Sequence, residues 1–167
     1  NCLVCNNESM GNGGGMRITG AAATVRNCTI VGNHADYAAG GLYACSSNFR
    51  VYNTVVALNT SDEDATTYAP NVTFAANVSA TILDHCAFSG KTCGSFAQEV
   101  TEADFPRAAR ANYRPSAASV CRNNGTVACW DNLTGVLDLA GGKRLVGKSI
   151  DIGCCERPIS GTLVFAR

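Results

Sequence analysis

The first half of the chain alternates between short β-branched runs and turn-forming residues. Runs such as Thr29-Ile30-Val31 and Val51–Val56 are rich in residues that favour strands. Glycine and asparagine bound these runs, and both suit turns and left-handed corners. No segment in residues 1–59 has the apolar stripe that a helix would need. The pattern therefore predicts short strands joined by tight turns.

These strands and turns recur at a fixed spacing. Gly14 opens one copy of the pattern and Gly40 opens the next, an offset of 40 − 14 = 26 residues. Asn27 and Asn53 share the same offset, since 53 − 27 = 26. A fixed period in the twenties is typical of a solenoid whose coils stack on one another. We therefore expect an all-β solenoid with coils of about 26 residues.

Asparagine occupies two positions of each expected coil. The first register holds Asn1, Asn27 and Asn53, and the second holds Asn7, Asn33 and Asn59. Paired strands lie about 4.7–4.9 Å apart, so side-chain amides at one register can hydrogen-bond along the stack. Amide ladders of this kind stabilise stacked strands. The sequence predicts such a ladder.

Several motifs resemble a known class of β-proteins. The coil motifs are Gly-Gly-x-Tyr, Asn-Cys-Thr-Ile-x-Gly-Asn and Asn-Thr-Val-Val-x-x-Asn, and further motifs lie at 112–119, 138–147 and 149–156. The coils resemble right-handed parallel β-helix proteins of the pectate-lyase-like architecture. The later motifs are similar to the "DLAGNPRI…DIGAYE" ending of large bacterial surface β-helix proteins. The likeness covers residues 1–59 and 104–156, and Cys154-Cys155 departs from that ending.

The resemblance implies a short right-handed parallel β-helix with a distinct C-terminal segment. Coils are expected over residues 1–93, and the pattern breaks from Gly94 onward. An open solenoid end exposes unpaired backbone groups that need a cover. Residues 94–167, in the same structural domain, are expected either to cap that end or to lie along one side. Their last apolar run is a candidate strand for pairing with another copy: Leu163, Val164 and Phe165.

Charge and hydropathy exclude several classes of partner. The 167-residue chain has 13 basic and 13 acidic residues, so it lacks the charge excess that a nucleic-acid or anionic-membrane partner favours. No run of about 20 apolar residues is available to span a membrane. The chain has no initiating Met or signal peptide and starts in register, which predicts a mature or trimmed product, such as the last coils of a longer solenoid.

The 10 cysteines favour an oxidising compartment, and hence an extracellular or cell-surface location. Candidate disulfides are Cys86 with Cys93, Cys121 with Cys129, and Cys2 with Cys28, the last two sharing a register. The alternative is that some cysteines are buried free thiols, which behave as small hydrophobes. The sequence leaves open the connectivity of the rest: Cys5, Cys45, Cys154 and Cys155.

The resemblance also raises the question of a polysaccharide lyase or hydrolase. Such enzymes carry acidic and basic residues outside one sheet and often use calcium. We expect no register that stacks carboxylates on adjacent coils, as that chemistry would require, and hence no catalytic set. The acidic loop Asp62-Glu63-Asp64 is a weak calcium candidate, with a solvated loop as the preferred interpretation. His34 and His85 lack the closed set of ligands that structural zinc needs, so no metal site is expected.

Aromatic and basic residues define a candidate carbohydrate-contact face. It comprises Arg26, Tyr52, Tyr43 and Trp130, and scattered packing aromatics are the alternative. We expect a non-enzymatic extracellular structural or adhesive protein. It would self-assemble through coil edges and the C-terminal strand into a homo-oligomer, filament or surface array. The alternative is a carbohydrate-binding or polysaccharide-degrading β-helix protein.

Overall fold

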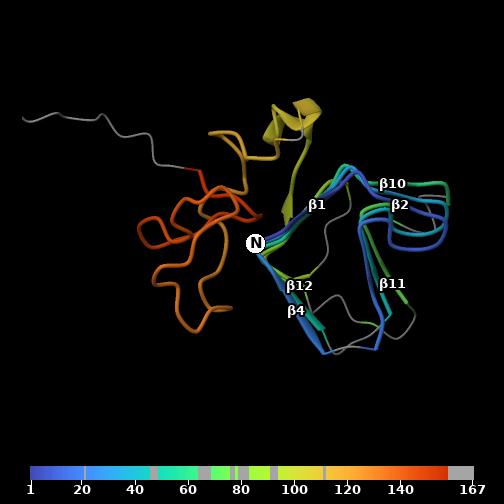
Figure 1. Cartoon of the computed structure of the whole chain (residues 1–167), viewed down its shortest axis with the longest axis horizontal. Coiled ribbons are helices and arrows are strands. Elements are labelled where there is room, and N and C mark those ends of the chain that lie inside the picture. Colours follow the sequence, from blue (N-terminus) through green and yellow to red (C-terminus); the bar gives the residue numbers. More distant parts are fainter. Residues whose placement is uncertain are drawn as a thin grey trace, which may run out of the picture.

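The computed structural model describes residues 1–20, 22–45, 49–63, 69–75, 78, 83–90, 94–110 and 112–157. The regular secondary structure of this part of the chain consists almost entirely of short parallel strands, which confirms the all-β prediction (Figure 1). Its helical segments are two 3-10 turns, η2 (Glu102–Asp104) and η3 (Ala108–Arg110). Nothing helical in these residues has the length and apolar character that crossing a membrane requires.

The chain makes successive passes, each of which contributes strands in the same order. The first pass contains β1 (Leu3–Cys5), β2 (Glu8–Ser9), β3 (Met16–Ile18) and β4 (Ala23–Arg26). The second contains β5 (Thr29–Val31), β6 (His34–Ala35), β7 (Leu42–Ala44) and β8 (Phe49–Tyr52). The third contains β9 (Val55–Ala57), β10 (Thr60–Ser61), β11 (Val72–Phe74) and β12 (Leu83–Asp84). β13 (Ala87–Phe88) and β14 (Gln98–Glu99) follow.

The strands pair in parallel into four sheets, ordered β1-β5-β9-β13-β14, β2-β6-β10, β3-β7-β11 and β4-β8-β12. Paired residues of the first passes lie 26 apart, as in Leu3 with Thr29 and Thr29 with Val55. The offset grows in the third pass, to 72 − 42 = 30 at Val72 and 83 − 51 = 32 at Leu83. The sequence period is therefore the period of strand pairing over the first two passes.

A residue in the left-handed conformation lies just before strands of the five-stranded sheet. Asn27, Asn53 and His85 have φ values of 52°, 49° and 49°. Asn53 donates its backbone N–H to the carbonyl oxygen of Asp84, so His85, and not Asp84, takes the place of Asn53 in the next pass. Asparagine tolerates this conformation better than most residues with a side chain, which explains its recurrence at the corner.

Apolar side chains between the sheets form the core. Its fully buried members include Ile30, Leu42, Phe49, Leu83 and Phe88. In β8 buried and exposed residues alternate, as in a strand with one solvated face. β5 and β9 are instead buried at every position, so the middle of the five-stranded sheet is covered on both faces.

The C-terminal segment, residues 100–157, supplies the second cover. Phe105, Tyr113 and Ile152 pack with Val31 and Val55 on the outer face of the five-stranded sheet. In Figure 1 the orange-to-red part of this segment lies beside the stacked passes. Within the expected segment 94–167, β14 adds to β13 at the end of the five-stranded sheet, while Phe105 and Ile152 lie along its outer face.

Gly14 and Gly40 lie where consecutive passes come closest. A Cβ on Gly14 would clash with the carbonyl oxygen of His34, and one on Gly40 with the carbonyl oxygen of Thr60. The two clashes are equivalent, since 40 − 14 and 60 − 34 both equal 26. The glycine pair that opens each copy of the sequence pattern is therefore required by packing.

Candidate functional site

The second asparagine register forms a continuous chain of amide hydrogen bonds. The side-chain nitrogens of Asn7, Asn33 and Asn59 each donate to the side-chain oxygen of the next member, over 2.9, 3.0 and 3.0 Å. The backbone N–H of each donates to the same oxygen. The last asparagine of this chain is Asn71, only 12 residues after Asn59. The side-chain nitrogen of Asn71 donates in turn to the hydroxyl oxygen of Ser89. The fixed period did not reveal Asn71.

The first register has a different role, because its amides bond to the C-terminal segment. Asn1 Nδ2 donates to the carbonyl oxygen of Leu137 over 2.7 Å. Asn27 Oδ1 accepts from the indole of Trp130 over 2.9 Å. Asn53 exchanges two bonds with the backbone of Thr126, over 2.8 and 2.7 Å. These asparagines therefore fasten the segment to the sheet instead of forming the expected ladder.

A buried ion pair organises the motif at 138–156. Arg144 and Glu156 are 0% and 4% exposed, and Arg144 Nη1 lies 2.6 Å from Glu156 Oε1. Arg144 also donates to Asn1 Oδ1 over 2.6 Å, which ties the motif to the first strand region. Burial, followed by repulsion from Asp151, raises the pKa of Glu156 from 4.5 to about 7 despite the neighbouring guanidinium.

Two aspartates of the same motif hold backbone turns. Asp138 Oδ1 accepts from the backbone N–H groups of Ala140 and Gly142, and its Oδ2 accepts from Glu156. Asp151 accepts from Asn123 and Arg157 in the same way. Because their carboxylate oxygens are taken by backbone donors, we interpret both aspartates as structural residues.

The candidate disulfides are not formed among the described cysteines. Cys2, Cys28, Cys121 and Cys129 are free thiols in this structure, as are Cys5, Cys45, Cys154 and Cys155. Cys121 is fully buried in the apolar cluster over the five-stranded sheet, and Cys129 Sγ instead lies 3.2 Å from the amide of Asn53. Cys28 is buried while Cys2 is exposed. Cys93 lies outside the described residues, so its pairing with Cys86 stays a prediction.

Cys154 and Cys155 form a vicinal thiol pair beside a cavity of about 250 Å³. Their sulfurs are 3.7 Å apart. A hydrogen bond from Cys154 lowers the pKa of Cys155 to about 7, whereas the same bond, together with burial, raises the pKa of Cys154. Cys155 is therefore the member of the pair that carries a thiolate near neutral pH.

The candidate carbohydrate face is only partly assembled. Arg26 and Tyr52 are paired across β4 and β8, and the Arg26 guanidinium lies 4.7 Å from the Trp130 ring centre. Arg26 also donates to the carbonyl oxygen of Cys129 over 2.6 Å, so it anchors the Trp130 loop. Tyr43 lies on β7 in another sheet, where Arg17 covers its ring at 5.8 Å.

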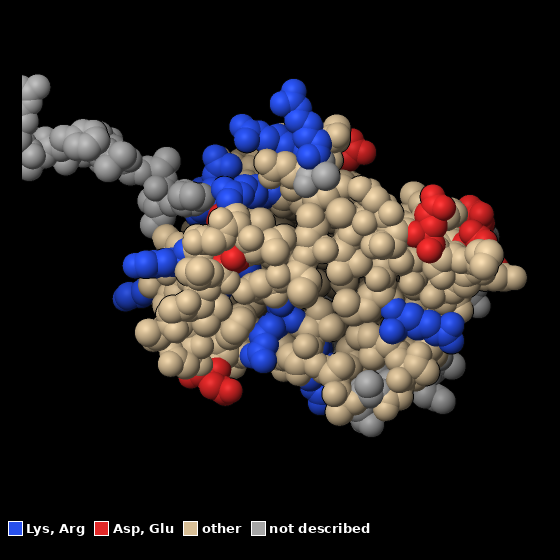
Figure 2. Space-filling model, in the orientation of Figure 1, with Lys and Arg blue, Asp and Glu red and all other residues tan. Residues whose placement is uncertain are grey.

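A basic cavity of about 530 Å³ lies within the C-terminal segment. Its described lining contains no carboxylate and includes Arg107, Arg114, Arg157 and Asn112. Figure 2 shows a group of Lys and Arg at the upper left and a group of acidic side chains at the right-hand end, near β2 and β10, with smaller groups of both signs elsewhere on this face.

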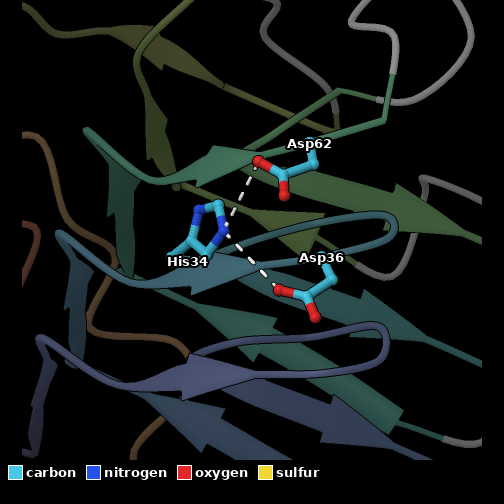
Figure 3. Close-up of side chains that lie close together, drawn as sticks. All are labelled: His34, Asp36 and Asp62. Carbon is cyan, nitrogen blue, oxygen red and sulfur yellow. Dashed lines mark ion pairs between the residues drawn. The ribbon is translucent and has the colours of Figure 1, made fainter.

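One histidine and two aspartates converge at that acidic end (Figure 3). His34 Nε2 lies 3.8 Å from Asp36 Oδ1 and 3.5 Å from Asp62 Oδ1, and all three potential ligand atoms lie within 4.8 Å of one another. The expectation that no register stacks carboxylates is wrong here, because 62 − 36 = 26. Asp62 belonged to the weak calcium candidate, whereas Asp64 of that candidate lies outside the described residues.

Comparison of the chain with known family models, with curated proteins and with solved structures found no match. The proposed assembly strand Leu163-Val164-Phe165 lies outside the described residues. A proposal for function therefore rests on the sheet edges, the two charged regions and the contacts given above.

Proposed function

We propose that this chain is a right-handed parallel β-helix protein with a non-enzymatic structural or adhesive role at the cell surface or outside the cell. The observation that carries the proposal is that all four sheets end together at one end of the stack, on β1, β2, β3 and β4. A sheet edge presents backbone groups that can template another strand. Another coil or another copy of the chain can therefore continue the stack from this end.

Two exposed residues point backbone donors outward from this end. In β2 the carbonyl oxygens of Asn7 and Ser9 accept backbone bonds from the next pass. Neighbouring residues of a parallel strand bond on opposite sides, so the N–H and C=O groups of Glu8 face the open edge. Arg17 has the same place in β3, between Met16 and Ile18, which both bond to the next pass.

Proline at these two positions tests the proposal. The variant Glu8→Pro/Arg17→Pro removes both outward N–H donors while keeping the bonds to the next pass. The matched control Glu8→Ala/Arg17→Ala removes the same side chains but keeps the donors. We expect the 167-residue chain and the alanine control to form end-to-end species in negative-stain microscopy and size-exclusion chromatography, and the proline variant to stay monomeric.

Two outcomes would overturn the proposal. One is that the unmodified chain stays a monodisperse monomer in both oxidising and reducing buffer. The other is that the folded proline variant assembles as readily as the alanine control. Circular dichroism establishes that each variant keeps its strands.

A second candidate function, binding of an acidic polysaccharide, is favoured by the basic cavity. Guanidinium groups bind carboxylate or sulfate in bidentate fashion, and the cavity has the volume typical of small-ligand sites. We expect retention on polygalacturonate but not on neutral dextran in affinity electrophoresis. Arg107→Gln/Arg114→Gln should abolish retention, whereas Arg110→Gln, on the exposed η3 turn outside the lining, should not. Equal retention on the neutral polymer would refute this candidate.

A further inference from the structure

We infer that His34, Asp36 and Asp62 form a binding site for a first-row transition-metal ion, with Zn²⁺ as the reference ligand. The inference is independent of the proposed assembly. It rests on three side chains that two neighbouring passes bring to one point at the acidic end of the molecule (Figure 3).

The parallel pairing of β6 and β10 builds the site. Thr60 pairs with His34 and Ser61 with Ala35. The next residues in this register are Asp36 and Asp62, and the backbone N–H of Asp62 donates to the carbonyl oxygen of Ala35 over 3.1 Å. Two carboxylates on adjacent parallel strands repel each other. A cation bound between the two carboxylates would offset this repulsion, so positive charge at this point stabilises the fold.

A hydrogen bond between His34 and Thr60, a residue of the next pass, orients the imidazole ring. His34 Nδ1 lies 2.9 Å from Thr60 Oγ1. In the tautomer with the proton on Nδ1, this nitrogen donates to the threonine oxygen, and the lone pair of Nε2 points towards both carboxylates. Histidines that bind metals are commonly held in this way, with the second ring nitrogen bonded to an oxygen acceptor. Thr60 is therefore a positioning residue for the site.

The separations fit a shared ion better than direct hydrogen bonds. His34 Nε2 lies 3.8 and 3.5 Å from the two carboxylate oxygens. Hydrogen bonds from a ring nitrogen to oxygen are usually about 2.7–3.2 Å long. Two ligands that are each about 2.1 Å from one tetrahedral or octahedral ion lie roughly 3.0–3.4 Å apart. Asp36 and Asp62 are exposed, so their side chains are free to rotate towards a shared ion from the present separations, all within 4.8 Å.

The ligand types decide which ion is favoured. Calcium prefers a set made up of oxygen ligands, whereas an imidazole nitrogen with carboxylates suits Zn²⁺ and related ions. Three protein ligands leave further coordination positions to water, as in open zinc sites. This nitrogen-containing site shares only Asp62 with the weak calcium candidate at Asp62-Glu63-Asp64.

NMR of the imidazole nitrogens provides the test. The chain has 2 histidines, so the His85→Gln variant assigns the signals, and zinc bound by cysteines does not shift the His34 ring directly. We expect Zn²⁺ to shift His34 Nε2 in a titration that reaches saturation after the free thiols have been filled. Calcium should not produce this shift.

Matched variants separate a built site from general attraction to an acidic loop. Asp36→Asn and Asp62→Asn should each weaken Zn²⁺ binding by about tenfold or more, and Thr60→Val by about tenfold through loss of ring orientation. Glu63→Gln, which removes the neighbouring charge, should leave the affinity nearly unchanged. The inference is overturned if Zn²⁺ does not shift the His34 signals. It is also overturned if Glu63→Gln weakens binding as much as Asp62→Asn, or if both asparagine variants bind like the original chain.

Discussion

Asn33 donates its side-chain amide to the side-chain oxygen of Asn59, 26 residues later, over 3.0 Å. That oxygen also accepts the backbone N–H of Asn33, and the amide nitrogen of Asn59 donates to Ile30 and Asn71. Asn59→Ala would leave several buried groups without partners, each at a cost of about 1–3 kcal/mol. We expect the free energy of unfolding to fall by about 3–5 kcal/mol in urea titrations.

Asn7 provides the control for this prediction. It forms the outermost rung of the same ladder and is exposed to solvent, so water can replace its lost bonds. Asn7→Ala should lower the free energy of unfolding by only about 1 kcal/mol. Equal losses in the two variants would contradict the view that buried rungs stabilise the stack.

The Arg144–Glu156 pair predicts a pH-dependent stability. The pKa of Glu156 is about 7 in the folded chain against an ordinary value of 4.5. The folded state therefore binds this proton more tightly than the unfolded state. The resulting stabilisation is complete below about pH 4.5 and is lost as the pH rises through 7. The shift corresponds to at most about 3 kcal/mol.

Glu156→Gln should flatten this pH dependence, because glutamine resembles the protonated acid and does not titrate. Thermal or urea unfolding between pH 5 and about pH 8 measures the slope. Glu102→Gln, at an exposed carboxylate in η2, should keep the slope of the original chain. If Glu156→Gln keeps it as well, another group causes the dependence.

The two thiol environments predict different reactivities. The pKa of Cys155 is lowered to about 7, whereas burial raises the pKa of Cys121 to about 12. Iodoacetamide should therefore modify Cys155 faster than Cys121, with a rate for Cys155 that reaches half its maximum near pH 7, while Cys121 stays unmodified in the folded protein. Peptide mapping by mass spectrometry gives both rates. Cys154→Ala should move the midpoint for Cys155 upward, and an unchanged midpoint would exclude the Cys154 hydrogen bond as its cause.

The Arg26–Trp130 contact predicts how firmly the C-terminal segment is held. Arg26→Ala removes a cation–π contact and a charged hydrogen bond, together about 2 kcal/mol. The indole N–H of Trp130, bonded to Asn27, should then exchange with solvent about 30-fold faster, with a red shift in tryptophan emission. Arg17→Ala removes the similar contact with Tyr43 and should change neither signal. Unchanged exchange in Arg26→Ala would mean that other contacts hold the loop.

The strands of the first two passes could be predicted because one physical signal repeats. β-branched runs, glycines at close approaches and asparagines at corners all recur with the spacing of strand pairing. The third pass was harder, since its offset grows to 30 and then 32 residues. The fourth rung of the ladder, Asn71, comes only 12 residues after the third, so periodic reasoning did not reach it.

The cluster of His34, Asp36 and Asp62 could have been predicted from the sequence. Asp36 and Asp62 have the same 26-residue offset that revealed the asparagine registers, and the expectation that no register stacks carboxylates overlooked this pair. The docking of the C-terminal segment could not have been predicted from the sequence. It depends on contacts such as Asn53 with Thr126, which are 73 residues apart and follow no period.

The contacts that fasten the C-terminal segment also set an order of events when the chain is made. Each pass needs only the one before it, so the sheets can grow as synthesis proceeds. Asn1, however, meets its guanidinium partner on Arg144 only after a further 143 residues, and Thr29 meets Cys154 after 125. Contacts between such distant residues form slowly. The bonds that Asn1 and Thr29 make to the C-terminal segment can therefore form only after that segment has been synthesised.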